Sequence, residues 1–196
     1  MTLSVIISMA LFALAASISP GPVNLVSLSS SARYGAKKGL IFVTGATFGF
    51  IALFLFIGFS LHYLIAQLVW ITGVLQWLGI AFLLYLSYQL FIDDGGLTAD
   101  AKQNAPTFMT GVIMQWLNPK AWLASLSGIA AYSPGAQGFE LVTFASLYLP
   151  ICWLSLGCWV WLGIRLGQHF QSPAKMRVMN KILALLLAGS CFLLLI

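Results

Sequence analysis

The chain has 196 residues, of which 61% are hydrophobic and 7% are charged, and its formal net charge is +5. Soluble domains carry roughly 25% charged residues, so this composition excludes a soluble globular protein and indicates a membrane protein. Nucleic-acid binding is excluded as well, because it needs basic residues on a soluble face, whereas the charges here are confined to short segments between long apolar runs.

Long uncharged runs predict six transmembrane helices and leave no room for a soluble domain. A span needs about 20 mainly apolar residues. The run from Gly39 to Ile92 contains no charged residue and is too long for one span, so we expect it to turn back near Ser60, His62 and Gln67. The predicted helices are 3–31, 40–62, 68–91, 107–131, 139–167 and 176–196.

The first predicted helix is interrupted. In the stretch SISPGPVNL, residues 17–25, Pro20, Gly21 and Pro22 stand together. Proline removes a backbone donor and clashes with the preceding turn, and glycine adds backbone freedom, so the helix must break or kink there. A broken backbone in hydrocarbon is costly unless protein or water satisfies it. Asn24, beside the break, either binds a substrate or caps the interrupted backbone.

The fourth predicted helix carries a second break, in the stretch QWLNPKAWL, residues 115–123. Lys120 is the only strong charge near the centre of a predicted span. An intramembrane lysine costs about 3 kcal/mol on insertion scales, so it normally faces a partner or a wet cavity. The alternative is a helix that begins later, with Lys120 reaching the cytoplasmic face. Gln115 and Asn118 place amide groups beside Pro119, for binding or for capping.

The two breaks occupy matching places in an internal repeat. An offset of 99 residues brings Pro20 onto Pro119. The same offset matches Thr44 to Thr143 within a block of four identities in nine positions. Thr44 is therefore a weaker candidate for lining a cavity.

Each half of the chain, about 1–92 and 107–196, would contain three helices. An odd number of spans makes the second half enter the membrane from the opposite side, so the repeats are inverted. Transporters built this way place the substrate site near the midplane, where proline-interrupted helices meet. We therefore expect a single transmembrane domain in which the two breaks face one another across a cavity.

Basic residues predict the orientation. They gather in two segments, Arg33, Lys37 and Lys38 in one and Arg165, Lys175, Arg177 and Lys181 in the other. Both segments are expected on the cytoplasmic side, with the linker 93–106, and both termini are expected outside. The early segment ALAAS resembles a signal-peptidase site, but no basic residue precedes the apolar run, so we expect no cleavage.

No cofactor and no metal site is expected. Cys152, Cys158 and Cys191 lie in predicted spans without paired spacing, so they are interpreted as small apolar residues. Gly45 and Gly49 form a small-xxx-small pattern that predicts close helix packing. A rival hypothesis is an integral-membrane enzyme acting on a lipid or lipid-linked substrate, and a third is a channel or structural subunit. The polar residues available to such an enzyme are Asp93, Asp94, Asp100 and His169.

The stretch SPGPVNL, followed by RYGAKKGLIFVTGATFG and later by GVIMQWLNPKAWL, resembles the LysE/RhtB family of bacterial amino-acid exporters, the LysE family translocators. The resemblance covers essentially the whole chain. It implies an inner-membrane carrier that exports an amino acid or a close derivative, driven by the proton gradient. The family's signature positions here are Pro20, Gly21, Pro22, Asn24, Asn118, Pro119 and Lys120.

One position departs from that resemblance. Many relatives have Asp or Asn directly after the proline-glycine-proline element, where this chain has Val23. The missing acid favours a neutral substrate, and the sequence resembles the branch that handles small neutral or sulfur-containing amino acids.

These observations predict a secondary exporter whose halves rock around a midplane cavity. Lys120 would hold the substrate carboxylate, and the loosened backbone around residues 19–24 would hold the amino group. Lys120 is also the only deep titratable group available for proton coupling. The expected partners are an amino acid and the lipid bilayer, with no nucleic acid; a homo-oligomer is left open.

Overall fold

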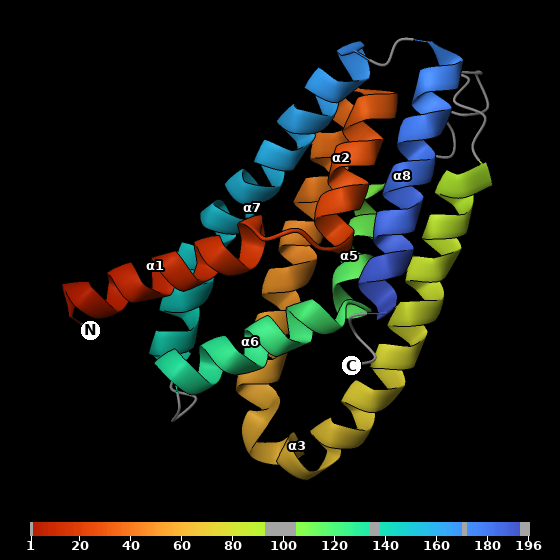
Figure 1. Ribbon diagram of the computed structural model, residues 1–196. Coiled ribbons are helices and arrows are strands. Elements are labelled where there is room, and N and C mark those ends of the chain that lie inside the picture. The colour runs from red at the N-terminus through yellow and green to blue at the C-terminus, as the bar shows by residue number, and fades with distance from the viewer. Residues whose placement is uncertain (1, 93–104, 134–137, 170–171, 193–196) are drawn as a thin grey trace.

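The computed structural model describes residues 2–92, 105–133, 138–169 and 172–192, and all regular structure in these ranges is α-helical (Figure 1). The helices are α1 (Leu3–Ile18), α2 (Pro22–Tyr34), α3 (Ala36–Ile92), α5 (Phe108–Trp116), α6 (Pro119–Tyr132), α7 (Gly138–His169) and α8 (Pro173–Phe192). The predicted all-α class is therefore confirmed.

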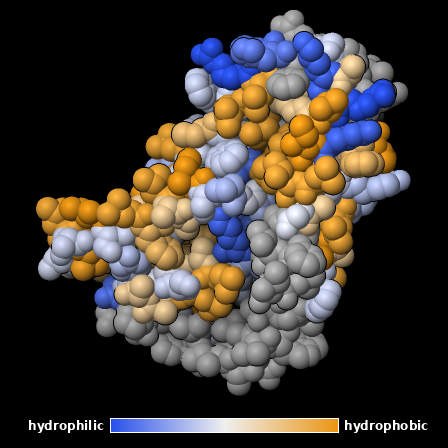
Figure 2. Space-filling view, in the orientation of Figure 1, coloured by the Kyte–Doolittle hydropathy of each residue, from blue (hydrophilic) through white to orange (hydrophobic). Residues whose placement is uncertain are grey.

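Several helices are suited to a bilayer. Among the described residues, Ala36–Ser60 and Gly138–His169 are long and apolar enough to cross a membrane, and the bent pair α1 and α2 is a third candidate if its two helices together form one span. Large apolar side chains such as Leu11 and Leu185 are exposed on the outside, as a lipid-facing surface requires. Figure 2 shows hydrophilic residues gathered at the end where α2 and α7 finish and α8 begins.

The prediction of two separate helices, 40–62 and 68–91, is wrong. The structure is helical without interruption through α3. Residues 60–67 contain neither proline nor glycine, so nothing in the sequence stops helical hydrogen bonding there. The chain still reverses, because Figure 1 shows α3 curving at its lower end and returning beside α8. Ser87 Oγ donates to Ala184 O at 2.8 Å and joins this returning arm to α8.

Both predicted breaks are present. The first separates α1 from α2, which starts at Pro22, and the two half-helices are bent by 60°. The second separates α5 from α6, which starts at Pro119. Proline suits the first position of a helix, because the N–H at that position has no intrahelical partner and the fixed φ is already helical. Each proline therefore begins a new half-helix.

The half-helix α2 is enclosed by protein. Residues 22–31 are all buried, and Figure 1 shows α2 between α7 and α8. A Cβ atom at Gly163 of α7 would overlap the carbonyl of Leu28, and one at Gly167 would overlap the carbonyl of Ala32. The absence of side chains at these two glycines lets the backbones of α2 and α7 touch.

The half-helix α5 is held against α3 in the same way. A Cβ atom at Gly45 would overlap the backbone of Phe108, and one at Gly49 would lie 2.7 Å from Val112 Cα. The packing predicted from the Gly45 and Gly49 pattern is confirmed. The other two half-helices, α1 and α6, point to the same side of the molecule in Figure 1, where α1 packs on α7 and α6 packs on α3.

Candidate functional site

Side chains from other parts of the chain satisfy the end of α1. The last carbonyl groups of a helix have no intrahelical partner, and hydrocarbon offers none. Asn24 Nδ2 donates to Ser17 O at 2.9 Å, and Trp159 Nε1 donates to Ile18 O at 3.1 Å. The break is therefore stabilised from α2 and from α7, two helices far apart in the sequence.

The ammonium group of Lys120 also binds this break. Its Nζ donates to Ser19 O at 2.7 Å and to Ser19 Oγ at 2.8 Å, with a longer contact of 3.5 Å to Pro20 O. These acceptors are neutral, and they lie at the end of α1, where the helix dipole is negative. Lys120 is half-buried and its ammonium contacts the end of α1, which favours a lysine inside the bundle over a snorkelling one; its depth in the bilayer stays a prediction.

No carboxylate neutralises the Lys120 charge within the described ranges. The only carboxylic side chain described there is Glu140, in the first turn of α7, and Lys120 forms no ion pair in that part of the chain. The lysine is held by dipoles alone. An anion entering the site would therefore find a positive charge without a counter-charge.

Both asparagines beside the breaks form backbone hydrogen bonds. Asn118 is the N-cap of α6, and its Oδ1 accepts from Lys120 N at 3.1 Å. Its Nδ2 lies 3.5 Å from Gln115 Oε1. Together with the bond from Asn24 to Ser17, these contacts support the capping interpretation. Capping does not exclude a role in binding, because Asn24, Gln115 and Asn118 also line a cavity.

Replacing Asn118 with alanine should remove the N-cap of α6 while Pro119 still starts the helix. We expect the free energy of unfolding in detergent to fall by about 1 kcal/mol, the typical cost of losing an N-cap. Asn118→Asp keeps an acceptor and should lose much less. Thermal unfolding of the purified variants measures this, and equal melting of the alanine variant and the parent would mean that the cap contributes nothing.

A cavity of about 40 Å³ lies where the two breaks meet. Its lining comes from α1, α2, α3, α6 and α7 and from the end of α5. The lining residues are Ala16, Ser17, Val23, Asn24, Phe50, Gln115, Asn118, Lys120, Ala121, Ala124, Tyr148, Cys152 and Leu156. In Figure 2 a narrow hydrophilic strip lies among hydrophobic residues near this level. The predicted meeting of the two breaks is present.

The other predicted site residues shape the break or lie elsewhere. A Cβ atom at Gly21 would lie 3.3 Å from both Cδ and Nζ of Lys120, so this glycine leaves space for the lysine. Pro20 is exposed, and Pro22 and Pro119 begin half-helices.

Thr44 is not among the cavity-lining residues. Its hydroxyl donates to Leu40 O at 2.8 Å and accepts from Trp153 Nε1 at 3.1 Å. The structure places this side chain in the contact between α3 and α7.

Sequence reasoning missed several residues of this site, including Ser19, Phe50, Tyr148 and Cys152. Ser19 binds Lys120, and Phe50, Tyr148 and Cys152 line the cavity. Ser19 stands inside the stretch that marked the first break, so a polar side chain there was a usable signal. The other three residues carry no motif, and only the packing of α7 against α3 brings them to the cavity.

Only one of the residues proposed for an enzyme, His169, lies in the described part of the chain. Asp93, Asp94 and Asp100 lie outside the described residues. His169 ends α7, where its Nδ1 lies 2.9 Å from Arg165 O. No group of three metal-ligating side chains occurs in the described part of the chain.

An apolar helical protein with two interrupted helices, and with a lysine that has no counter-charge among the described residues where they meet, has the features of the class of membrane transporters. The chain is a member of the LysE type translocator family, whose model matches residues 14–196. It is therefore an integral membrane protein and a transporter rather than an enzyme.

Three relatives show how far the similarity extends. The chain is 27% identical over 182 residues to the cysteine/O-acetylserine efflux protein of Escherichia coli O6:K15:H31 (strain 536), with 90% of each chain covered. It is 25% identical over 182 residues to the protein of the same description from Salmonella typhimurium (strain LT2), again with 90% of each covered. It is 23% identical over 184 residues to an uncharacterized membrane protein of Vibrio cholerae serotype O1, covering 91% of this chain and 90% of the relative. No solved structure matches the chain.

Proposed function

We propose that this transporter exports a small neutral amino acid or a close derivative, with sulfur-containing substrates favoured, from the cytoplasm across the bacterial inner membrane. The observation that carries the proposal is the half-buried Lys120 ammonium, which lines a cavity at the junction of two broken helices without a carboxylate partner. The substrate class is supported by the relatives from Escherichia and Salmonella, which are described as cysteine/O-acetylserine efflux proteins.

A zwitterion suits the charges around this break. The Lys120 ammonium would bind the substrate carboxylate, and the carbonyl groups of Ser19 and Pro20 would bind the substrate ammonium. Gly21, the N-cap of α2, supplies no side-chain acceptor, so the positive end of α2 is also open to an anion.

Substrate binding is then an exchange of hydrogen-bond partners at the break. Lys120 now donates to the carbonyls that the substrate ammonium would take. The substrate would insert between them, its carboxylate accepting from Nζ and its ammonium donating to the released carbonyls. Each buried polar group keeps a partner, which matters because a buried donor or acceptor without one costs about 1–3 kcal/mol.

The distribution of acidic residues supports a neutral substrate side chain. Glu140, at the start of α7, is the only described carboxylic side chain and does not line the cavity. A lysine or arginine substrate would leave its second charge in the cavity without a partner, and burying an unpaired charge is strongly unfavourable.

We propose further that the chain forms six transmembrane spans as two inverted repeats, 1–92 and 107–196, with the linker 93–106 and the hydrophilic end in Figure 2 on the cytoplasmic side. The half-helices α2 and α5 are fixed by the glycine contacts. The half-helices α1 and α6, which meet at the cavity, are then the parts that move. A cavity of about 40 Å³ has room for only a few water molecules, so binding requires such movement.

Proton coupling belongs to the same proposal. Lys120 is the titratable cation in the cavity lining, and its protonation state decides whether the carboxylate is attracted. Entry of a proton from outside would restore the ammonium after each cycle.

Purified protein in liposomes tests the function directly. We expect saturable counterflow of cysteine or serine without chemical change, faster when a pH gradient is imposed, and none in liposomes without protein. Flux that neither saturates nor responds to the pH gradient would identify a channel. Absence of flux for every neutral amino acid would refute the export proposal.

A further inference from the structure

We propose that the cavity wall formed by Ser17, Tyr148 and Cys152 is a side-chain subsite, which takes a short neutral side chain ending in a thiol, a hydroxyl or another small hydrogen-bonding group. Ser17 is the specificity-determining residue, because its hydroxyl binds that terminal group. The inference rests on the proposed function, since it requires an amino acid in the cavity.

The hydroxyl of Ser17 lies beside the side chains of Tyr148 and Cys152 without forming a well-directed hydrogen bond to either. Ser17 is only 9% exposed and lines the cavity, and its Oγ forms no hydrogen bond in the described part of the chain. Buried hydroxyl groups normally have a hydrogen-bond partner, and an unsatisfied one is costly. The Ser17 carbonyl is already taken by Asn24, so the hydroxyl is the group left for a ligand.

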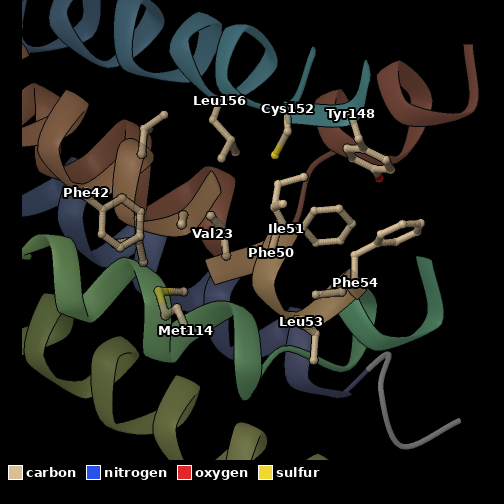
Figure 3. Packing of buried hydrophobic residues seen from close by; sticks show 14 of the residues in the cluster. Val23, Phe42, Phe50, Ile51, Leu53, Phe54, Met114, Tyr148, Cys152 and Leu156 are labelled. Atoms are coloured by element: carbon tan, nitrogen blue, oxygen red, sulfur yellow. The ribbon is translucent and has the colours of Figure 1, made fainter. Parts of the chain in front are cut away.

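The rest of this wall comes from α7. Tyr148 and Cys152 are one helical turn apart, and both are buried close enough to Ser17 for its hydroxyl to interact with them, so a ligand group would share this hydroxyl with their side chains. Figure 3 shows both side chains pointing from α7 toward Phe50 of α3. The ring centroids of Tyr148 and Phe50 are 4.5 Å apart, and Cys152 Sγ lies 4.0 Å from Thr47 Oγ1.

The composition of this cavity wall selects substrate side chains by their length and polarity. The wall has polar tips and apolar flanks but no charged side chain. A long side chain would meet the packed rings of Tyr148 and Phe50, and a charged one would lose its hydration without gaining a counter-charge. A short side chain with one donor or acceptor would satisfy Ser17. A site built to hydrogen-bond a substrate rejects the analogue that lacks the bonding group.

The test compares substrates of equal size. Cysteine, serine and 2-aminobutyrate have the same number of heavy atoms and differ only in the terminal thiol, hydroxyl or methyl. The full-length protein is reconstituted in liposomes with a reductant present, and counterflow of each is measured. We expect the parent to prefer cysteine and serine to 2-aminobutyrate by about fivefold, the ratio that corresponds to one neutral hydrogen bond.

Two variants of Ser17 and a matched control test whether this residue causes the preference for cysteine and serine over 2-aminobutyrate. Ser17→Ala should bring the ratio to about one, and Ser17→Thr, which keeps a hydroxyl, should retain most of it. The control is Ser125→Ala. Ser125 also has a buried hydroxyl without a hydrogen bond in the described residues, but it lies on α6 outside the cavity lining. This control should show the parental ratio.

The outcomes separate this inference from the proposed function. A parent that moves none of the three compounds overturns export and the subsite together. A parent that transports 2-aminobutyrate as well as cysteine and serine overturns the subsite alone, whatever the variants do. Retention of the parental ratio by Ser17→Ala also overturns it, whereas loss of the ratio in Ser17→Ala but not in Ser125→Ala supports it.

Discussion

Replacing Lys120 with methionine will reduce transport by about a hundredfold or more, while the protein still inserts into the membrane. Methionine matches the apolar stem of lysine as far as Cε but removes the ammonium that would bind the substrate carboxylate. Losing a charge-assisted hydrogen bond costs about 3 kcal/mol, and each 1.4 kcal/mol is a factor of ten. Initial counterflow rates, normalised to reconstituted protein, give the measurement.

Two further variants separate charge from packing. Lys120→Arg keeps the positive charge and should retain measurable transport. Lys175→Met removes an exposed lysine near the start of α8 and should transport like the parent. If Lys120→Met transports at the parental rate, the assignment of Lys120 to the carboxylate is wrong. If both Lys120 variants fail to insert, the contact with Ser19 is needed for folding.

Replacing Gly163 with valine will prevent α2 from packing on α7. A Cβ atom there would overlap the carbonyl oxygen of Leu28 and the hydroxyl of Ser31, and backbone cannot rotate away as a side chain can. Overpacking typically costs about 1–3 kcal/mol, and we expect the upper end because a whole half-helix must shift. Thermal stability in detergent and the yield of monodisperse protein measure the effect.

Gly157→Val is the matched control for this prediction. Gly157 lies on the same helix, and a Cβ atom there would meet nothing within 4 Å. Both substitutions impose the same change in helix propensity, so the difference between them isolates the contact with α2. Equal stability of the two variants would mean that α2 and α7 are not in backbone contact.

The sequence was a good guide to the positions of the breaks. Pro20, Gly21 and Pro22 forbid a continuous helix, and the structure ends α1 at Ile18 and begins α2 at Pro22. The region near residues 60–67 was predicted less well. The polar residues there indicated a turn, but polar residues are also compatible with a helix. Because this region has no proline or glycine, α3 continues through it.

The sequence by itself determined the membrane class, the two interruptions and a lysine directly after the second one, because these follow from local properties: hydropathy, the missing N–H of proline and the order of residues in the chain. Only the tertiary structure decided what those groups contact. Lys120 meets Ser19 across 101 positions of the chain, and Tyr148 and Cys152 reach the cavity because α7 packs against α3. Such contacts depend on how helices pack, which no local property of the chain specifies.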